Sequence, residues 1–108
     1  MFKKIVKRDG RIVDFDSTKI TNAIFKAGQA TGEFGMDIAK HLTIKVLDLA
    51  MEIIKEKIPT VEEIQDIVEE VLLHSPYKKT AKAYIIYREQ HAKIREITTK
   101  ANLELINQ

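Results

Sequence analysis

Apolar residues recur with the spacing of helices over most of this chain, and glycine and proline divide them into four stretches. The first stretch follows Asp16 or Ser17, either of which can cap a helix, and it ends near Gly32. Gly28 lies inside this stretch and is expected to weaken or shorten the helix, because glycine disfavours helix interiors. The second stretch covers about residues 37–56, and its broad apolar surface predicts burial on more than one side.

The third stretch has the clearest start and the clearest periodicity. Ile58-Pro59 ends the helix before it. Thr60 and Glu63 then match a capping box, in which each side chain binds the backbone N–H of the other residue. The apolar stripe that follows consists of Ile64, Ile67, Val68, Val71 and Leu72.

A fourth helix is predicted from about Lys79 to beyond Ile94, after a break at 74–76. One face of it places the guanidinium of Arg88 on an apolar stripe that is formed by Ala81, Tyr84, Ile85 and Ala92. A buried arginine needs a partner, and this partner is either a ligand phosphate or one of the carboxylates Glu62, Glu63 and Asp66. Residues 96–108 have helical composition without a cap, and we expect a helical extension or a linker to a further domain.

The N-terminal segment has the pattern of a β-hairpin. Asp9-Gly10 is a strong turn signal, because glycine adopts the positive φ that a two-residue hairpin turn requires. A single hairpin is not stable alone, so it should cover one end or face of the helices. We therefore expect an α+β fold, mainly α, in which a small N-terminal sheet caps a four-helix bundle with mostly antiparallel packing.

Cations are dense around this hairpin and at the start of the first helix. Lys7, Arg8 and Arg11 crowd the turn, and Lys19 falls in the first helical turn, where the helix dipole favours anions. A helix N-terminus flanked by cations is a phosphate site, so Lys7, Arg8 and Lys19 are candidates to bind a nucleotide polyphosphate. The alternative is a hairpin with a solvated basic face.

Composition and missing motifs count against several classes of function. The 108 residues carry 18 basic and 16 acidic side chains, a balance that disfavours general nucleic-acid binding. Cysteine is absent, which excludes disulfides and thiolate metal sites. No apolar run has the length of a membrane span and no signal peptide is recognisable, so we expect a cytoplasmic protein. Without a Walker loop, a Gly-x-Gly-x-x-Gly motif or histidines at metal-binding spacing, we expect no catalytic residue and no metal ligand.

Several blocks of the sequence together resemble the ATP-cone, a regulatory nucleotide-binding module. This module stands at the N-terminus of many ribonucleotide reductases and also occurs in a bacterial repressor of reductase genes. The resemblance covers about residues 3–95, and the matching blocks are Val-Lys-Arg-Asp-Gly-Arg at 6–11, Phe-Asp-x-x-Lys-Ile at 15–20, Val-Glu-Glu-Ile-Gln-Asp-Ile-Val-Glu at 61–69 and Ala-Tyr-Ile-Ile-Tyr-Arg at 83–88. It implies a small sheet over four helices, with nucleotide bound beneath the sheet.

The resemblance also implies roles for single residues. Gln65, which would otherwise be assigned to the surface, lines the pocket in similar sequences, and Val61 lies next to the base. Asp16 matches a ligand-contacting position, although helix capping is our first interpretation of it. The register of the first strand decides which of its apolar residues faces inward. The expected nucleotide-binding residues are Ile5, Val6, Lys7, Arg8, Asp16, Lys19, Val61, Gln65 and Arg88.

The function implied by the resemblance is allosteric. The domain is expected to bind ATP or dATP, with or without Mg²⁺, and to control the activity or oligomerisation of a ribonucleotide reductase without hydrolysis. The tail from 88 to 103 is similar to anaerobic ribonucleoside-triphosphate reductases, so the catalytic domain of such an enzyme and a second cone are the expected partners. Two alternatives remain, the ATP-cone of a nucleotide-sensing repressor and a helical protein-interaction module that uses the basic hairpin. The repressor's zinc ribbon needs cysteines that this chain lacks.

Overall fold

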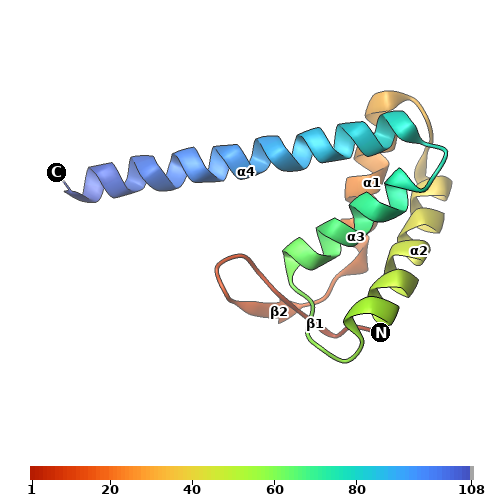
Figure 1. The fold of residues 1–108 in the computed structure, drawn as a ribbon, viewed down its shortest axis with the longest axis horizontal. Helices are drawn as coiled ribbons and strands as arrows, with labels where there is room; N and C mark the ends of the chain where they lie inside the picture. The colour runs from red at the N-terminus through yellow and green to blue at the C-terminus, as the bar shows by residue number, and fades with distance from the viewer. Residues whose placement is uncertain (108) are drawn as a thin grey trace.

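The computed structural model describes the backbone of residues 1–107 and the side chains of residues 1–98 and 100. A two-stranded antiparallel hairpin comes first, and four helices follow it (Figure 1). This order confirms the expected α+β fold, mainly α, with a small N-terminal sheet. The elements are β1 (Lys4–Val6), β2 (Ile12–Asp14), α1 (Ser17–Thr31), α2 (Met36–Ile54), α3 (Val61–Leu73) and α4 (Lys78–Asn107).

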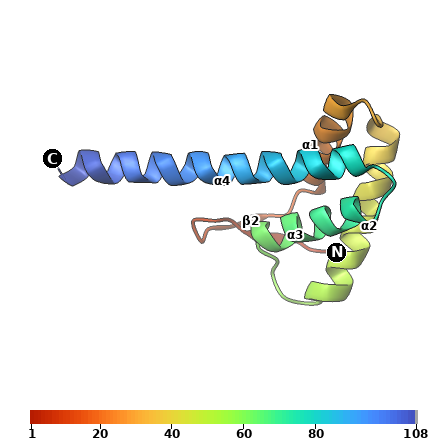
Figure 2. The same cartoon turned by 45° about the horizontal axis from the view of Figure 1, so that its top comes forward.

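The four helices form a ring of contacts in which α1 packs on α2, α2 on α3, α3 on α4 and α4 on α1. Helices α1 and α2 run in opposite directions, as do α3 and α4, and the second pair lies across the first (Figures 1 and 2). Ile24, Val46, Val68 and Leu72 are fully buried at the centre. The C-terminal part of α4 projects beyond the other elements (Figure 1).

Backbone hydrogen bonds attach the hairpin to the segment that leads into α3. Ile5 pairs with Val13 across the hairpin, and Gly10 adopts a φ of 89° in the turn, as the sequence predicted. Val6 donates its N–H to the carbonyl of Pro59 at 2.9 Å and forms a parallel bridge with Thr60. These contacts place β1 under the start of α3 and leave the side chain of Ile5 packed against the core.

Helix α1 ends in a Schellman motif centred on Gly32. This glycine has a φ of 75°, and the N–H of Glu33 reaches back to the carbonyl of Gly28 at 3.0 Å. The expectation that Gly28 would shorten the helix is wrong, because α1 continues through it to Thr31. Gly28 is buried against the ring of Phe34, which occupies the space that a side chain at this position would need.

Helix α2 differs from its prediction in length and in burial. It ends at Ile54, where Lys55 leaves helical geometry with a φ of 62°. Ile44 and Ile53 are 57% and 60% exposed, so burial on more than one side is wrong for these two positions. The physical reason is that its main neighbours, α1 and α3, cover a limited part of the helix surface.

The starts of α3 and α4 are capped in different ways. The capping box of α3 is confirmed, with Glu63 N–H donating to Thr60 Oγ1 at 3.1 Å and Thr60 N–H donating to Glu63 Oε1 at 3.0 Å. All five residues of the predicted stripe are buried. Near the start of α4, the Oε1 atom of Glu33 accepts bonds from the N–H and the hydroxyl of Thr80 at 2.6 and 2.8 Å. This carboxylate comes from the α1–α2 loop, so the contact is tertiary.

Candidate functional site

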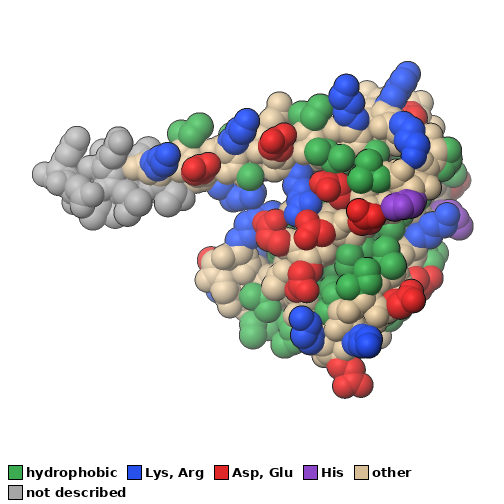
Figure 3. Space-filling view, viewed as in Figure 1, with side chains coloured by type: hydrophobic (Ala, Val, Ile, Leu, Met, Phe, Trp, Pro, Cys, Tyr) green, Lys and Arg blue, Asp and Glu red, His purple; other side chains and the backbone are tan. Residues whose placement is uncertain are grey.

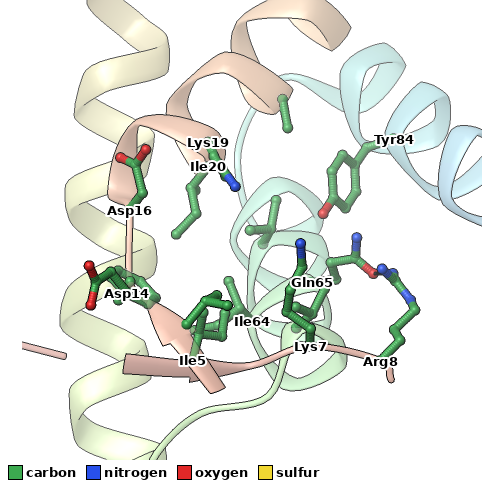
Figure 4. A pocket seen from close by; sticks show the side chains of 15 residues that line it. Ile5, Lys7, Arg8, Asp14, Asp16, Lys19, Ile20, Ile64, Gln65 and Tyr84 are labelled. Carbon is green, nitrogen blue, oxygen red and sulfur yellow. Dashed lines mark hydrogen bonds between the residues drawn. The ribbon is translucent and has the colours of Figure 1, made fainter. Parts of the chain in front are cut away.

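A cavity of ≈ 260 Å³ opens between the hairpin, α1, α3 and α4 (Figure 4). This volume is close to the lower end of the ~300–1,000 Å³ typical of small-molecule sites. The cavity unites segments that are distant in sequence, and α2 contributes no described residue to its lining. The lining consists of Ile5, Lys7, Arg8, Val13, Asp14, Phe15, Asp16, Lys19, Ile20, Ala23, Val61, Ile64, Gln65, Val68 and Tyr84.

The walls of the cavity are apolar, and each wall follows from the local structure of one element. Ile5 and Val13 face each other across the hairpin, so both side chains lie on the same side of the sheet. Ile64 and Val68 lie one helical turn apart on α3 and present one continuous surface. Such walls favour the flat, weakly polar faces of an aromatic ring over water.

Lys7 and Lys19 bring two positive charges to this apolar space. Lys7 directly follows β1 and Lys19 lies in the first turn of α1, and Figure 4 shows both ammonium groups pointing inward from opposite sides. Among the described residues, neither side chain makes a hydrogen bond or an ion pair. Hydrogen bonds lower the pKa values of Asp16 and Asp9, and the nearby charges of Lys19 and Lys7 respectively add to this effect. Neither ammonium group is neutralised by a direct ion pair with a described residue. Two such cations beside an apolar cavity make an environment that attracts an anionic ligand.

Asp16 caps α1, which confirms the helix-capping role predicted for it. Its Oδ1 atom accepts from the N–H of Thr18 at 3.0 Å and from the hydroxyl of Thr18 at 2.6 Å. These hydrogen bonds are the main reason why the pKa of Asp16 lies below its ordinary value. The carboxylate also belongs to the cavity lining, but it lies on the far side from Gln65 and Arg8 (Figure 4).

Arg8 lines the cavity and is already held by α3. Its Nε atom donates to Glu62 Oε1 at 2.6 Å, and its Nη2 atom donates to Gln65 Oε1 at 2.7 Å. Gln65 is half-buried and lines the cavity as well, so the alternative of a simple surface glutamine does not describe its position. The hairpin and α3 are therefore joined beside the cavity by side chains as well as by backbone.

Arg88 lies outside the cavity lining, behind Gln65. Its side chain is 17% exposed and is surrounded by carboxylates of α3. It donates to Gln65 Oε1 at 3.1 Å and to carboxylate oxygens at 3.1, 2.7 and 3.3 Å, which belong to Glu62, Asp66 and Glu69 respectively. The sequence left open whether Arg88 binds a phosphate or a carboxylate, and this structure shows carboxylates. Glu63, one of the three candidate carboxylates, is not among them, because it belongs to the capping box of α3.

Of the three expected binding residues that remain, two line the cavity and one does not. Val61 lines the cavity, and of the two strand residues Ile5 does so while Val6 does not. The pairing of Val6 with Thr60 explains this choice, because successive side chains of a strand point to opposite sides. Seven of the nine expected residues thus line one cavity, and Val6 and Arg88 do not.

Tyr84 also lines the cavity, although its place on the apolar face of the fourth helix was all that the sequence predicted for it. It is 5% exposed, and its hydroxyl points into the cavity towards Lys7 and Lys19 (Figure 4). Burial raises the pKa of Tyr84 from its ordinary value of 10.0 to about 12, so the phenol is neutral at physiological pH. The available signal was its place on the same helical face as Arg88.

The described part of the chain holds neither a cluster of metal-ligating side chains nor a helix that could span a membrane. No group of three or more histidine or acidic side chains there is arranged to hold a metal ion. None of the described helices combines the length and the apolar character needed to cross a membrane.

Comparison with known proteins assigns the segment that forms this cavity to a family. A family model described as the ATP cone domain matches residues 3–93. The chain belongs to the ATP-cone family. The match spans the hairpin and all of the described cavity-lining residues, so the cavity lies within the part of the chain that belongs to this family.

Relatives of this ATP cone are ribonucleotide reductases of several kinds. It is 45% identical over 101 residues to the vitamin B12-dependent ribonucleoside-diphosphate reductase of Thermoplasma acidophilum, covering 89% of this chain and 13% of that protein. It is 35% identical to the ribonucleoside-diphosphate reductase subunit alpha of Chlamydia pneumoniae, over 84% of this chain and 9% of that protein. It is 33% identical to the anaerobic ribonucleoside-triphosphate reductase of Salmonella typhimurium, over 97% of this chain and 14% of that protein. The chain therefore spans a small part of each of these relatives.

Proposed function

We propose that this ATP cone binds ATP or dATP in the cavity and thereby regulates a ribonucleotide reductase. The observation that carries the proposal is that Lys7 and Lys19, which make no side-chain hydrogen bond or ion pair with another described residue, converge on an apolar cavity. A nucleotide has the same two parts, an aromatic base and a polyanionic chain. The family match supports nucleotide over other ligands that combine an apolar part with negative charge.

The arrangement of the lining suggests how the nucleotide lies. We place the triphosphate beside Lys7, Lys19 and Arg8, because these are the cationic groups of the lining. The base is placed against apolar walls such as Ile64. The amide of Gln65 and the hydroxyl of Tyr84 can then donate to or accept from polar edges of the base or the ribose.

Regulation follows from binding without hydrolysis. The sequence contains no Walker loop, and no metal-binding constellation lies in the described part of the chain, so we propose binding without hydrolysis. A cone that only binds reports the ratio of ATP to dATP, and each nucleotide shifts an equilibrium by as much as it prefers one state. The catalytic domain and a second cone are the proposed partners, and the anaerobic kind expected from the tail sequence is among the relatives.

Isothermal titration calorimetry on the chain, with and without Mg²⁺, tests the proposed site. Lys7→Ala and Lys19→Ala should each weaken ATP binding by about tenfold or more, because a hydrogen bond to a charged group contributes about 1.5–3 kcal/mol. Lys45→Ala is the matched control, since Lys45 is an exposed lysine of α2, which contributes no described residue to the lining. Unchanged ATP affinity in both cavity variants would refute the phosphate assignment.

The regulatory part of the proposal needs the full-length reductase. The nucleotide-free enzyme and its ATP and dATP complexes should differ either in association state, measured by sedimentation, or in protection of the helices, measured by hydrogen exchange. Identical profiles in all three conditions would contradict a regulatory role. Sustained ADP release by the isolated chain, abolished by Lys7→Ala, would contradict binding without hydrolysis.

A further inference from the structure

Arg8 differs from the other two cations of the cavity because its charge is already in use. Lys7 and Lys19 make no described side-chain hydrogen bond. Arg8, in contrast, donates its Nε to Glu62 at 2.6 Å and its Nη2 to Gln65 at 2.7 Å. A phosphate that binds the Nε–Nη2 edge of this guanidinium must first displace the carboxylate of Glu62.

The same acceptors also bind Arg88 of α4. Glu62 accepts from Arg8 with Oε1 and from Arg88 with Oε2, the second bond being 3.1 Å long. Gln65 Oε1 accepts from both arginines, at 2.7 and 3.1 Å. In Figure 3, acidic and basic side chains gather where α4 passes over α3. The acidic groups Glu62 and Asp66 belong to α3, and their basic partner Arg88 belongs to α4. Glu62 therefore has a second cation to hold if Arg8 leaves it.

We propose that Glu62 is an affinity-determining residue of the ATP cone, a carboxylate that competes with the ligand's phosphates for Arg8. This inference rests on the proposed function, since it requires a phosphate ligand in the cavity. In the free cone Glu62 holds Arg8 at the edge of the cavity. When nucleotide binds, the guanidinium of Arg8 exchanges this carboxylate for phosphate oxygens, and Glu62 remains paired with Arg88.

The charge state of Glu62 at physiological pH fits this competition. Partial burial by itself raises the pKa of Glu62, but hydrogen bonds and charges from Arg88 and Arg8 outweigh it and hold the pKa below its ordinary value. The carboxylate is thus ionised when nucleotide arrives. Its side chain is 53% exposed, so the contact with Arg8 is screened by water and can be exchanged at modest cost.

Titration of ATP and of adenosine into a Glu62→Gln variant measures the competition. The neutral amide is a weaker acceptor for Arg8, so ATP should bind about two- to fivefold more tightly, the range expected for one exposed ion pair. Adenosine has no phosphate to recruit Arg8, so its affinity should stay the same. Most substitutions in a binding site weaken binding, and the expected gain is therefore distinctive.

Two comparisons separate competition for Arg8 from a general effect of charge. Asp66 lies one turn along α3 and pairs with Arg88 at 2.7 Å, with no described bond to Arg8, so Asp66→Asn should leave ATP affinity nearly unchanged. In an Arg8→Gln background, Glu62→Gln should have no effect on ATP binding. Circular dichroism and thermal unfolding of each variant confirm that the fold is retained.

The failure of this inference is distinguishable from failure of the proposed function. If the wild-type chain binds no ATP, or binds it independently of Lys7 and Lys19, the proposed site is wrong. If ATP binding depends on both lysines but Glu62→Gln leaves it unchanged or weakens it, only the competition is refuted. An equal gain in Asp66→Asn, or a gain that persists without Arg8, also refutes it.

Discussion

Replacing Gly28 by alanine should destabilise the cone, although alanine is the better helix former. Gly28 lies inside α1 and is buried, and the ring of Phe34 packs directly over its Cα. A methyl group at this position would lie 2.5 Å from Cδ1 and Cζ of Phe34 and closer still to Cε1. Carbon atoms pack at about 3.5–4.0 Å, so the ring must move by at least ~1 Å.

Two opposing energies decide the sign of the change. Gly→Ala in a helix interior is worth about 1 kcal/mol of stabilisation, whereas overpacking costs about 1–3 kcal/mol. The steric cost should win, because the ring of Phe34 also packs edge-on against Tyr77, with centroids 4.8 Å apart. We expect a net loss of about 1 kcal/mol, which lowers the melting temperature by about 4–8 °C in a domain of this size.

A double-mutant cycle with Phe34→Ala isolates the cause. Without the ring the clash disappears, and Gly28→Ala should then stabilise the chain by up to about 1 kcal/mol. Urea unfolding of the four nucleotide-free proteins, followed by circular dichroism, gives the free energies of unfolding. The reasoning is refuted if Gly28→Ala stabilises the wild-type chain, or if its effect has the same sign and size in both backgrounds.

Two further predictions concern Tyr84 and Glu33. The pKa of Tyr84 is raised from 10.0 to about 12, so above pH 10 the unfolded chain loses this proton first and stability should fall as the pH rises towards 12. The free energy of unfolding should fall by about 2–3 kcal/mol over this range. Urea unfolding of a Tyr84→Phe variant, which lacks the titrating phenol, should not show this loss and so separates it from other alkaline titrations. Glu33→Ala should lower the free energy of unfolding by about 1–3 kcal/mol, because the N–H of Thr80 loses its acceptor, while the hydroxyl of Thr80 keeps only its contact with Thr31 Oγ1 at 2.9 Å. Glu33→Gln keeps an acceptor oxygen and should lose much less; equal losses in both variants would contradict this account.

Much of the fold was predictable because its signals are local. The capping box of Thr60 and Glu63, the turn at Gly10 and the helix end at Gly32 each depend on residues within a few positions of one another. The buried stripe of α3 follows from helical periodicity alone. Gly28 was misjudged because the ring that needs its empty space belongs to the following loop.

The candidate site was predictable in part. Seven of the nine expected residues line one cavity, which reflects the charge density around the hairpin together with the family resemblance. Tyr84 was missed as a cavity residue because helical periodicity assigns it to an apolar face without showing what that face covers. The partners of Arg88 stayed open because a buried guanidinium satisfies its charge equally well with phosphate or with carboxylate.

The element types, their caps and turns, and the positive charge at the N-terminal end of the chain all follow from local sequence. Each of these depends on backbone geometry and side-chain chemistry over a few neighbouring residues. Three features depend instead on long-range packing: Ile5 rather than Val6 faces the cavity, Glu33 binds the start of α4, and Glu62 is shared by two arginines. The deciding quantity in all three is the register and crossing of elements far apart in the chain, because hydrogen bonds act over about 3 Å and a one-residue shift would replace each partner.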